Sequence, residues 1–176
     1  MENGGGRVTC TGRNRLAEAI YEQFDTRTGF DAAVDCLLEQ AGRELRIFDP
    51  DGQALRLNDA ARSAALERFL LASRTRRLFL VLHDTDHLTR YCPRGMLLLQ
   101  RFSHAIQVNR THEEIREVQD AFLVLDAAHY VRRPVATSMR GAMGLNDDTE
   151  ALAMRGRFQE IWAASFPAVS ASTAGL

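Results

Sequence analysis

Lysine is absent from the chain, and all 22 of its basic residues are arginine. This absence excludes chemistry that needs a lysine amine, such as a Schiff base, a lysine general base or a lysine ligand for phosphate. The 23 acidic residues bring the formal net charge to −1. A nearly neutral chain has no overall attraction for nucleic acid or for an acidic lipid surface.

Cysteines and long apolar runs are also scarce. The three cysteines are widely spaced, odd in number and form no C-x-x-C pair, which argues against a disulfide framework and a zinc ribbon. No apolar run approaches the ~18 residues of a membrane span, and residues 1–13 lack the apolar core of a signal peptide. We therefore expect a cytoplasmic protein with no membrane partner. No G-x-S-x-G sequence marks a serine nucleophile and no glycine-rich phosphate loop occurs, and we expect no cofactor.

The 176 residues are sufficient for one domain with a sizeable core. We expect a flexible tail over residues 1–13, a single domain over residues 14–167 and a second flexible tail over residues 168–176. The apolar periodicity predicts helices over residues 15–24, 30–41 and 58–74, a helix that starts at Pro93 and another that starts near Asp147, and strands over residues 44–48, 77–82, 105–108, 122–125 and 129–133. Residues 134–145 are expected to form a loop, and Thr111 and Glu114 fit a capping box.

The order of these elements predicts the fold class. Helices and strands alternate three times, and two further strands and a helix follow. This order is typical of an α/β fold in which a mostly parallel sheet is sandwiched by helices. The nearly continuous apolar run of residues 77–82 suits a parallel strand that is covered on both faces.

Three short sequences point to a known family. They are the turn RIFDPDG after the first predicted strand, the strand AFLVLD that ends at Asp126, and the later N-x-x-x-E from Asn146 to Glu150. With the order of elements, they resemble one half of a phospholipase D-like domain, over Phe30 to Trp162. More narrowly, they resemble an uncharacterised bacterial family of such domains, some of which are attached to acetyltransferase-like modules. The resemblance implies a phospholipase D/nuclease-like half-domain fold.

The catalytic motif of the resembled superfamily, H-x-K-x(4)-D, is not intact in this chain. If Asp126 is the aspartate of the motif, Gln119 stands at the histidine position and Ala121 at the lysine position. If His112 is the histidine, Glu114 stands at the lysine position and Gln119 at the aspartate position. A glutamine is not a useful nucleophile and an alanine cannot neutralise a phosphate, so the phosphodiesterase activity of the superfamily is not expected here. His112, Gln119, Asp126, Asn146 and Glu150 are then vestigial site residues, and we expect the first three to converge in a cleft.

Five arginines lie in the stretch from residue 110 to residue 140. If they gather at one place, Arg110, Arg116, Arg132, Arg133 and Arg140 can form a basic rim for a phosphate or a nucleic-acid backbone. The alternative is a set of scattered surface arginines. Only Tyr130 is an aromatic neighbour, so base stacking on a single strand is not indicated.

The sequence His83-Asp84-Thr85-Asp86-His87 is the densest group of potential ligands. It follows a predicted parallel strand, where α/β proteins tend to bind ligands, and His83, Asp84, Asp86 and His87 could hold a divalent metal. The alternative is a solvated loop in which Asp84 or Thr85 caps the next helical turn.

These observations lead to three hypotheses for function. The first is a catalytically degenerate phospholipase D-like domain that binds a phosphate-bearing ligand or nucleic acid, or that supports assembly. The second is a hydrolase that uses His112, or a metal held at residues 83–87, with rewired chemistry. The third is a structural partner of an acetyltransferase-type protein. Because two halves build one site in the resembled superfamily, a lone half implies a homodimer whose two-fold axis lies near Gln119 to Asp126.

Overall fold

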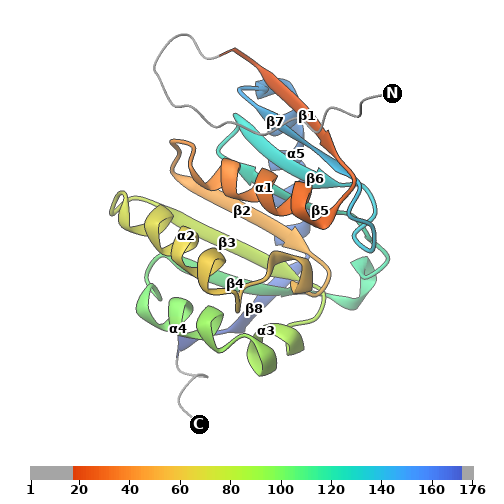
Figure 1. The fold of residues 1–176 in the computed structure, drawn as a ribbon. Helices are drawn as coiled ribbons and strands as arrows, with labels where there is room; N and C mark the ends of the chain where they lie inside the picture. Colours follow the sequence, from red (N-terminus) through yellow and green to blue (C-terminus); the bar gives the residue numbers. More distant parts are fainter. Residues whose placement is uncertain (1–17, 172–176) are drawn as a thin grey trace.

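The computed structural model describes residues 18–171, which form one eight-stranded sheet with helices on both faces (Figure 1). The strands are β1 (Ile20–Phe24), β2 (Glu44–Asp49), β3 (Arg77–Leu82), β4 (Ile106–Thr111), β5 (Ala121–Leu125), β6 (His129–Arg133), β7 (Gly141–Leu145) and β8 (Ser165–Val169). The α-helices are α1 (Arg27–Leu38), α2 (Ala60–Leu71), α3 (Asp86–Tyr91), α4 (Pro93–Arg101) and α5 (Asp148–Ala163). Two 3-10 turns, η1 (Gln53–Leu55) and η2 (Glu113–Ile115), complete the set.

The strand order is β1-β7-β6-β5-β2-β3-β4-β8. Only β2–β3 and β3–β4 are parallel pairs, and the other five pairs are antiparallel. The prediction of a mostly parallel sheet is therefore wrong. The parallel pairs are those that a helical crossover joins, whereas β5, β6 and β7 follow one another through connections too short for a crossover and must pair antiparallel.

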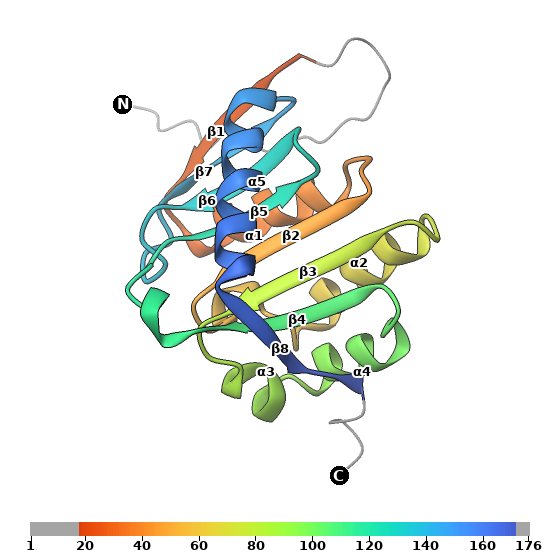
Figure 2. The same ribbon diagram turned by 180° about the vertical axis from the view of Figure 1, so that it is seen from behind.

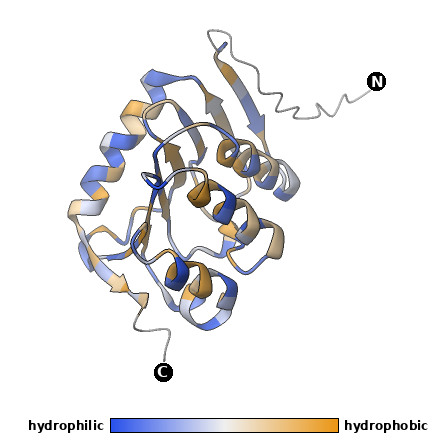
Figure 3. Ribbon diagram, turned by 90° about the vertical axis from the view of Figure 1, so that its left-hand side faces the viewer, coloured by the Kyte–Doolittle hydropathy of each residue, from blue (hydrophilic) through white to orange (hydrophobic). Residues whose placement is uncertain are grey.

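The two faces of the sheet carry separate hydrophobic cores. Helices α1 to α4 cover one face, and α5 lies across the other, as Figures 1 and 2 show from opposite sides. Phe30, Phe69 and Leu82 are buried in the larger core, and Phe48 and Phe158 in the core under α5. The central strands are mostly hydrophobic, whereas the helices carry hydrophilic residues on their outer faces (Figure 3). All five residues of β5 are buried, as expected for a strand covered on both faces.

Most of the predicted elements are confirmed, with shifted ends. α1, α2 and α4 and the strands β2 to β6 lie where the periodicity predicts them. Helix α2 is capped by Asp59, whose side chain accepts hydrogen bonds from two backbone amides. The capping box at Thr111 is wrong, because Thr111 is the last residue of β4 and η2 has no side-chain cap.

Three strands were not predicted. Residues 20–24 form β1 instead of part of a helix, and the remainder of the predicted helix over residues 15–17 lies outside the described residues. Residues 141–145 form β7 within the predicted loop. β8 includes residues 168 and 169, which the sequence assigns to a flexible tail; the ranges 1–13 and 172–176 lie outside the described residues. Proline and glycine hid the last two strands, since Pro167 suits an edge strand and the glycines of β7 suit close packing.

Of the large apolar residues of α5, Phe158 and Ile161 are buried, Trp162 is half-buried and Leu152 is 60% exposed. No helix within residues 18–171 is both long enough and apolar enough to span a membrane.

Candidate functional site

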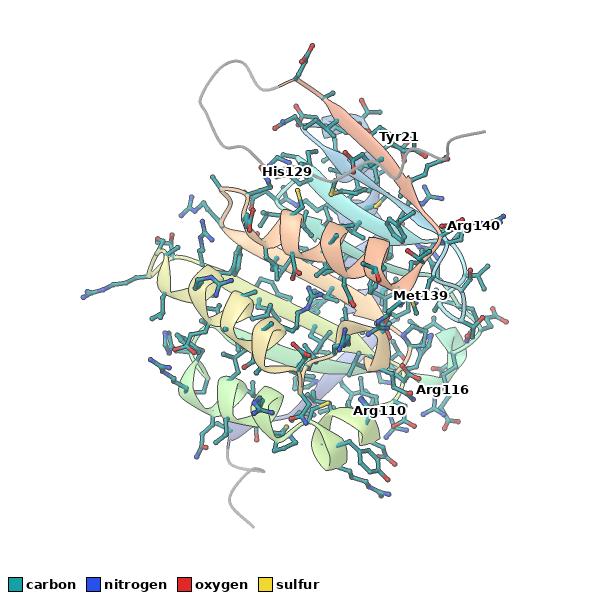
Figure 4. The ribbon with its side chains drawn as sticks, viewed as in Figure 1. Tyr21, Arg110, Arg116, His129, Met139 and Arg140 are labelled. Carbon is teal, nitrogen blue, oxygen red and sulfur yellow. The ribbon has the colours of Figure 1, made fainter. Side chains whose placement is uncertain are left out.

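The candidate residues are distributed over two opposite edges of the sheet. We call the edge at which β2, β3 and β4 end the carboxyl edge; the antiparallel β5 begins there at Ala121, and β6 ends there at Arg133. The opposite edge contains the starts of β2, β3 and β4, the end of β5 and the start of β6. Figure 4 shows Arg110, Arg116 and Arg140 toward the right-hand side at the carboxyl edge, and His129 near the top and to the left of them.

The vestigial motif residues do not converge. Gln119 precedes β5 and Asp126 follows it, so the five residues of the strand separate them by about 17 Å. Asp126 lies at the opposite edge, has φ +54° and accepts hydrogen bonds from the backbone amides of Arg43 (3.1 Å) and Glu44 (2.9 Å). This carboxylate joins the start of β2 to the end of β5, and the predicted cleft between His112, Gln119 and Asp126 is not formed.

The space beside Ala121 is occupied by a buried ion pair. Arg133 lies directly across the strand pair from Ala121, and its side chain is 1% exposed. Its Nη2 donates to Asp49 Oδ2 at 2.7 Å, and its Nη1 donates to the carbonyl oxygen of Ala136 at 2.6 Å. The guanidinium also lies over the ring of Phe30, 4.6 Å from the centroid. The prediction that Arg133 belongs to an exposed basic rim is therefore wrong.

The protonation of this pair reflects two opposing causes. Burial raises the pKa of Asp49, whereas the charge of Arg133 and hydrogen bonds from the amides of Gly52 and Asp51 act to lower it. Burial likewise lowers the pKa of Arg133, and the carboxylate of Asp49 opposes this change. The short contact and the surrounding amides offset only part of the loss of water, because burial is the largest influence on the pKa of both groups and Arg133 Nε has no hydrogen-bond partner among the described residues.

Both ring nitrogens of His83 contact groups of the fold, so His83 has a structural role and is not free to bind a metal ion. Its Nε2 lies 2.6 Å from the carbonyl oxygen of Val118, and its Nδ1 lies 2.6 Å from Thr111 Oγ1. Because a carbonyl oxygen only accepts, Nε2 carries a proton, and the hydroxyl of Thr111 can donate to Nδ1. His83 thereby holds the segment after η2 against the end of β3.

The other predicted metal ligands do not join His83. Asp84 Oδ1 accepts a hydrogen bond from the backbone amide of Asp86, the first residue of α3. The ring of His87 packs beside that of Tyr91, with the ring centroids 5.8 Å apart. In the described part of the chain, no group of three or more His, Cys, Asp or Glu side chains is arranged to hold a metal ion. The loop makes a local turn before α3, and the N-cap residue Thr85 makes no side-chain capping hydrogen bond.

Three of the predicted arginines have no partner for their guanidinium groups among the described residues. They are Arg110 in β4, Arg116 after η2 and Arg140 before β7, and all three lie at the carboxyl edge (Figure 4). Arg132 differs, because its Nη1 lies 3.7 Å from Glu150 Oε2. Arg110, Arg116 and Arg140 are therefore available to an anion, although the exposed Glu113, Glu114 and Glu117 are close in the chain.

A groove of about 880 Å³ opens beside the start of α5. Its lining includes Tyr130, Arg132, Arg140 and Glu150. Burial and the nearby carboxylates of Asp147 and Glu150 raise the pKa of Tyr130 to about 12, so this phenol remains protonated at neutral pH. The groove contains both charge signs and does not by itself select an anion.

The two remaining vestigial site residues, Asn146 and Glu150, lie apart from each other. Glu150 lines the groove, whereas Asn146 follows β7 at the opposite edge with φ +55°. The backbone amide of Asn146 donates to His129 Nδ1 at 3.1 Å, which requires an unprotonated Nδ1. Burial lowers the pKa of His129 in agreement with this bond.

The structure adds one residue that the sequence did not indicate. Phe166 of β8 pairs with Arg110 across the strand pair, and its ring centroid lies 5.0 Å from that of His112. It was missed because β8 was missed. A short apolar segment with one proline, SFPAV, is the signal of an edge strand that could have revealed it.

Comparison with protein families places the chain in one of them. Residues 26–171 match the family described as a domain of unknown function, DUF7931, so the chain belongs to this family. A search of curated proteins found no match.

Solved structures share the fold. Nuc from Salmonella typhimurium, a phospholipase D family member, has a TM-score of 0.61 and 13% identity over 87% of this chain and 100% of Nuc. TrmBL2, an archaeal chromatin protein with a novel mode of DNA binding, has a TM-score of 0.62 and 12% identity over 84% of this chain. The chain spans about half (54%) of TrmBL2. The phosphatidylserine synthase of Haemophilus influenzae Rd KW20 has a TM-score of 0.55 and 13% identity over 90% of this chain and 41% of the synthase. The fold is therefore phospholipase D-like.

Proposed function

We propose that this protein is a binding module with a phospholipase D-like fold and without phosphodiesterase activity, and that it binds a phosphate-bearing ligand at the carboxyl edge. The observation that carries the proposal is the presence of three guanidinium groups, of Arg110, Arg116 and Arg140, at one edge without carboxylate partners among the described residues. Guanidinium groups bind phosphate oxygens through pairs of charge-assisted hydrogen bonds, which makes such an edge suited to a phosphate-rich chain.

The residues at the positions of the resembled catalytic motif support a role in binding rather than in catalysis. Gln119 and Ala121 cannot supply the nucleophile and the phosphate-binding amine of the resembled motif. The Arg133–Asp49 pair also fills the space beside Ala121 with groups that are already paired. Phosphodiester cleavage by the purified protein, in the presence of divalent ions, would contradict this part of the proposal.

Nucleic acid is the first ligand to test, and the shared fold with the DNA-binding TrmBL2 supports this choice. We expect a fluorescently labelled oligonucleotide to bind with an affinity that falls as salt rises from about 50 to about 200 mM, because bound phosphates release counterions. The triple variant Arg110→Gln, Arg116→Gln, Arg140→Gln should bind more weakly. The slope of log affinity against log salt should become shallower by about 2 for a single strand. Fluorescence anisotropy measures both quantities.

The matched control changes three other arginines that also lack a side-chain partner among the described residues. Arg43 and Arg74 lie in loops before β2 and β3, and Arg155 lies on α5, so the variant Arg43→Gln, Arg74→Gln, Arg155→Gln removes the same charge away from the carboxyl edge. It should keep the salt slope of the unmodified protein. An equal loss in both triple variants, or no salt-dependent binding, overturns the proposal.

A further inference from the structure

We infer that the His112–Phe166 ring pair, beside Arg110, is a base-stacking site that makes the carboxyl edge selective for single-stranded nucleic acid over duplex. This inference rests on the proposed function and names the ligand of the same edge.

The first observation is the exposure of the two rings. The centroids of His112 and Phe166 lie 5.0 Å apart with planes tilted by 43°. Phe166 is 40% exposed, whereas Phe30, Phe48, Phe69, Phe122 and Phe158 are each 2% exposed or less. His112 is exposed as well. An aromatic pair that is not used to fill the core can accept a further ring, and every nucleobase has such a face.

The second observation is that the backbone beside both rings is held by hydrogen bonds. The amide of His112 donates to the carbonyl oxygen of Ala164 at 2.9 Å, and Thr111 pairs with Ser165 across the β4–β8 ladder. The hydroxyl of Ser165 donates to the carbonyl oxygen of Trp162 at 2.6 Å and accepts from the side-chain Nδ2 of Asn109 at 2.9 Å. The start of β8 is thus fixed on both sides, so little conformational entropy is lost when a base stacks.

The third observation is the charge beside the rings. Arg110 is the cross-strand partner of Phe166, so a phosphate bound to its guanidinium places the attached nucleotide at the ring pair. Arg116 lies four residues after His112 and can hold a neighbouring phosphate. Phosphate contacts position a nucleic acid, and the ring contact then depends on a base that can be reached.

Single strands are favoured for two physical reasons. The bases of a duplex are stacked and paired, so only an unpaired strand offers a free base face, and each base stacked on an aromatic side chain contributes about 1–3 kcal/mol. The exposed carboxylates Glu113 and Glu114 lie between His112 and Arg116 in the chain, where they repel the second phosphate backbone of a duplex.

The test compares a labelled oligothymidine of about 12 nucleotides with a duplex of the same length, both titrated against the full chain. Phe166→Leu removes the aromatic ring and keeps an apolar side chain. It should weaken single-strand binding by about 5- to 100-fold, the effect of one lost stack, and leave duplex binding unchanged. His112→Ala should also weaken single-strand binding, and Phe166→Tyr should retain it.

Leu71→Ala is the control, because Leu71 is a 60% exposed apolar residue at the end of α2, away from the carboxyl edge. It should bind both ligands as the unmodified protein does. If Phe166→Leu binds the single strand normally while the arginine triple variant still loses its salt slope, the stacking site is refuted and the proposed function stands. Equal losses on both ligands also refute selectivity, and the absence of any salt-dependent binding refutes both proposals.

Discussion

Arg133 shows how a single residue changes the interpretation of the site. In a strand, neighbouring residues point to opposite faces, so Arg132 and Arg133 of β6 cannot share an environment. Arg132 is exposed, and Arg133 is among the most buried side chains in the described chain. In HYVRR the two arginines are adjacent and so point to opposite faces, and the burial of one of them could have been predicted from this. Its partner Asp49 could not, because the two residues are 84 positions apart in the chain.

The Asp49–Arg133 pair leads to a prediction for stability. Asp49→Asn leaves a buried guanidinium without its carboxylate, so the free energy of unfolding should fall by about 3–5 kcal/mol, measured by urea denaturation. Arg157→Gln breaks a pair with Asp120 in which the arginine is 47% exposed, and should cost about 1 kcal/mol or less. Equal effects of the two variants would show that Asp49 and Arg133 are not held as a buried charge pair.

At the scale of elements, the strands with strong apolar patterns could be predicted and the strands with weak patterns could not. β3 and β5 are largely apolar runs and β2 alternates charged and apolar residues over its first four positions, so their positions follow from the sequence alone. β7 has the sequence GAMGL, in which two glycines imitate a loop. A glycine is needed at position 144 because a Cβ atom there would lie 2.3 Å from a ring carbon of Tyr130. This requirement becomes visible only when β6 and β7 are paired.

Gly144 therefore provides a prediction about β7. Gly144→Ala forces the buried ring of Tyr130 away from the strand, and we expect thermal or urea unfolding to show a loss of about 1–3 kcal/mol. Gly156→Ala is the matched control within α5, because a Cβ atom at that position would have no neighbour within 4 Å. That variant should gain about 0.5–1 kcal/mol, since alanine favours a helix interior. A neutral Gly144→Ala would mean that Tyr130 can leave the strand without cost.

For the whole molecule, the class of fold could be predicted but the direction of most strands could not. The helical crossovers into β3 and β4 are visible in the sequence, and they correspond to the two parallel pairs. The antiparallel pairs of β1 with β7 and of β4 with β8 join segments that are far apart in the chain, and no local pattern encodes them. The five arginines could be named from the sequence, but their division into paired and unpaired members depends on those long-range contacts.

The homodimer implied by the resemblance stays a prediction. We expect sedimentation equilibrium at high protein concentration to give twice the 19.7 kDa mass of the chain. The expectation rests on the resemblance to the phospholipase D superfamily, in which two halves build one site. A single species with the mass of one chain at high concentration contradicts the prediction, and a lower-concentration run provides the control for mass action.

The two outermost strands, β1 and β8, lie at opposite ends of the strand order, with six strands between them. At about 4.8 Å between neighbouring strands, these two borders are separated by roughly 34 Å. Figures 1 and 2 show them at the top and the bottom of the molecule. A partner that pairs with the free edge of β1 and a partner that pairs with the free edge of β8 would therefore be held apart by the full width of the sheet, so the module would act as a rigid spacer between them.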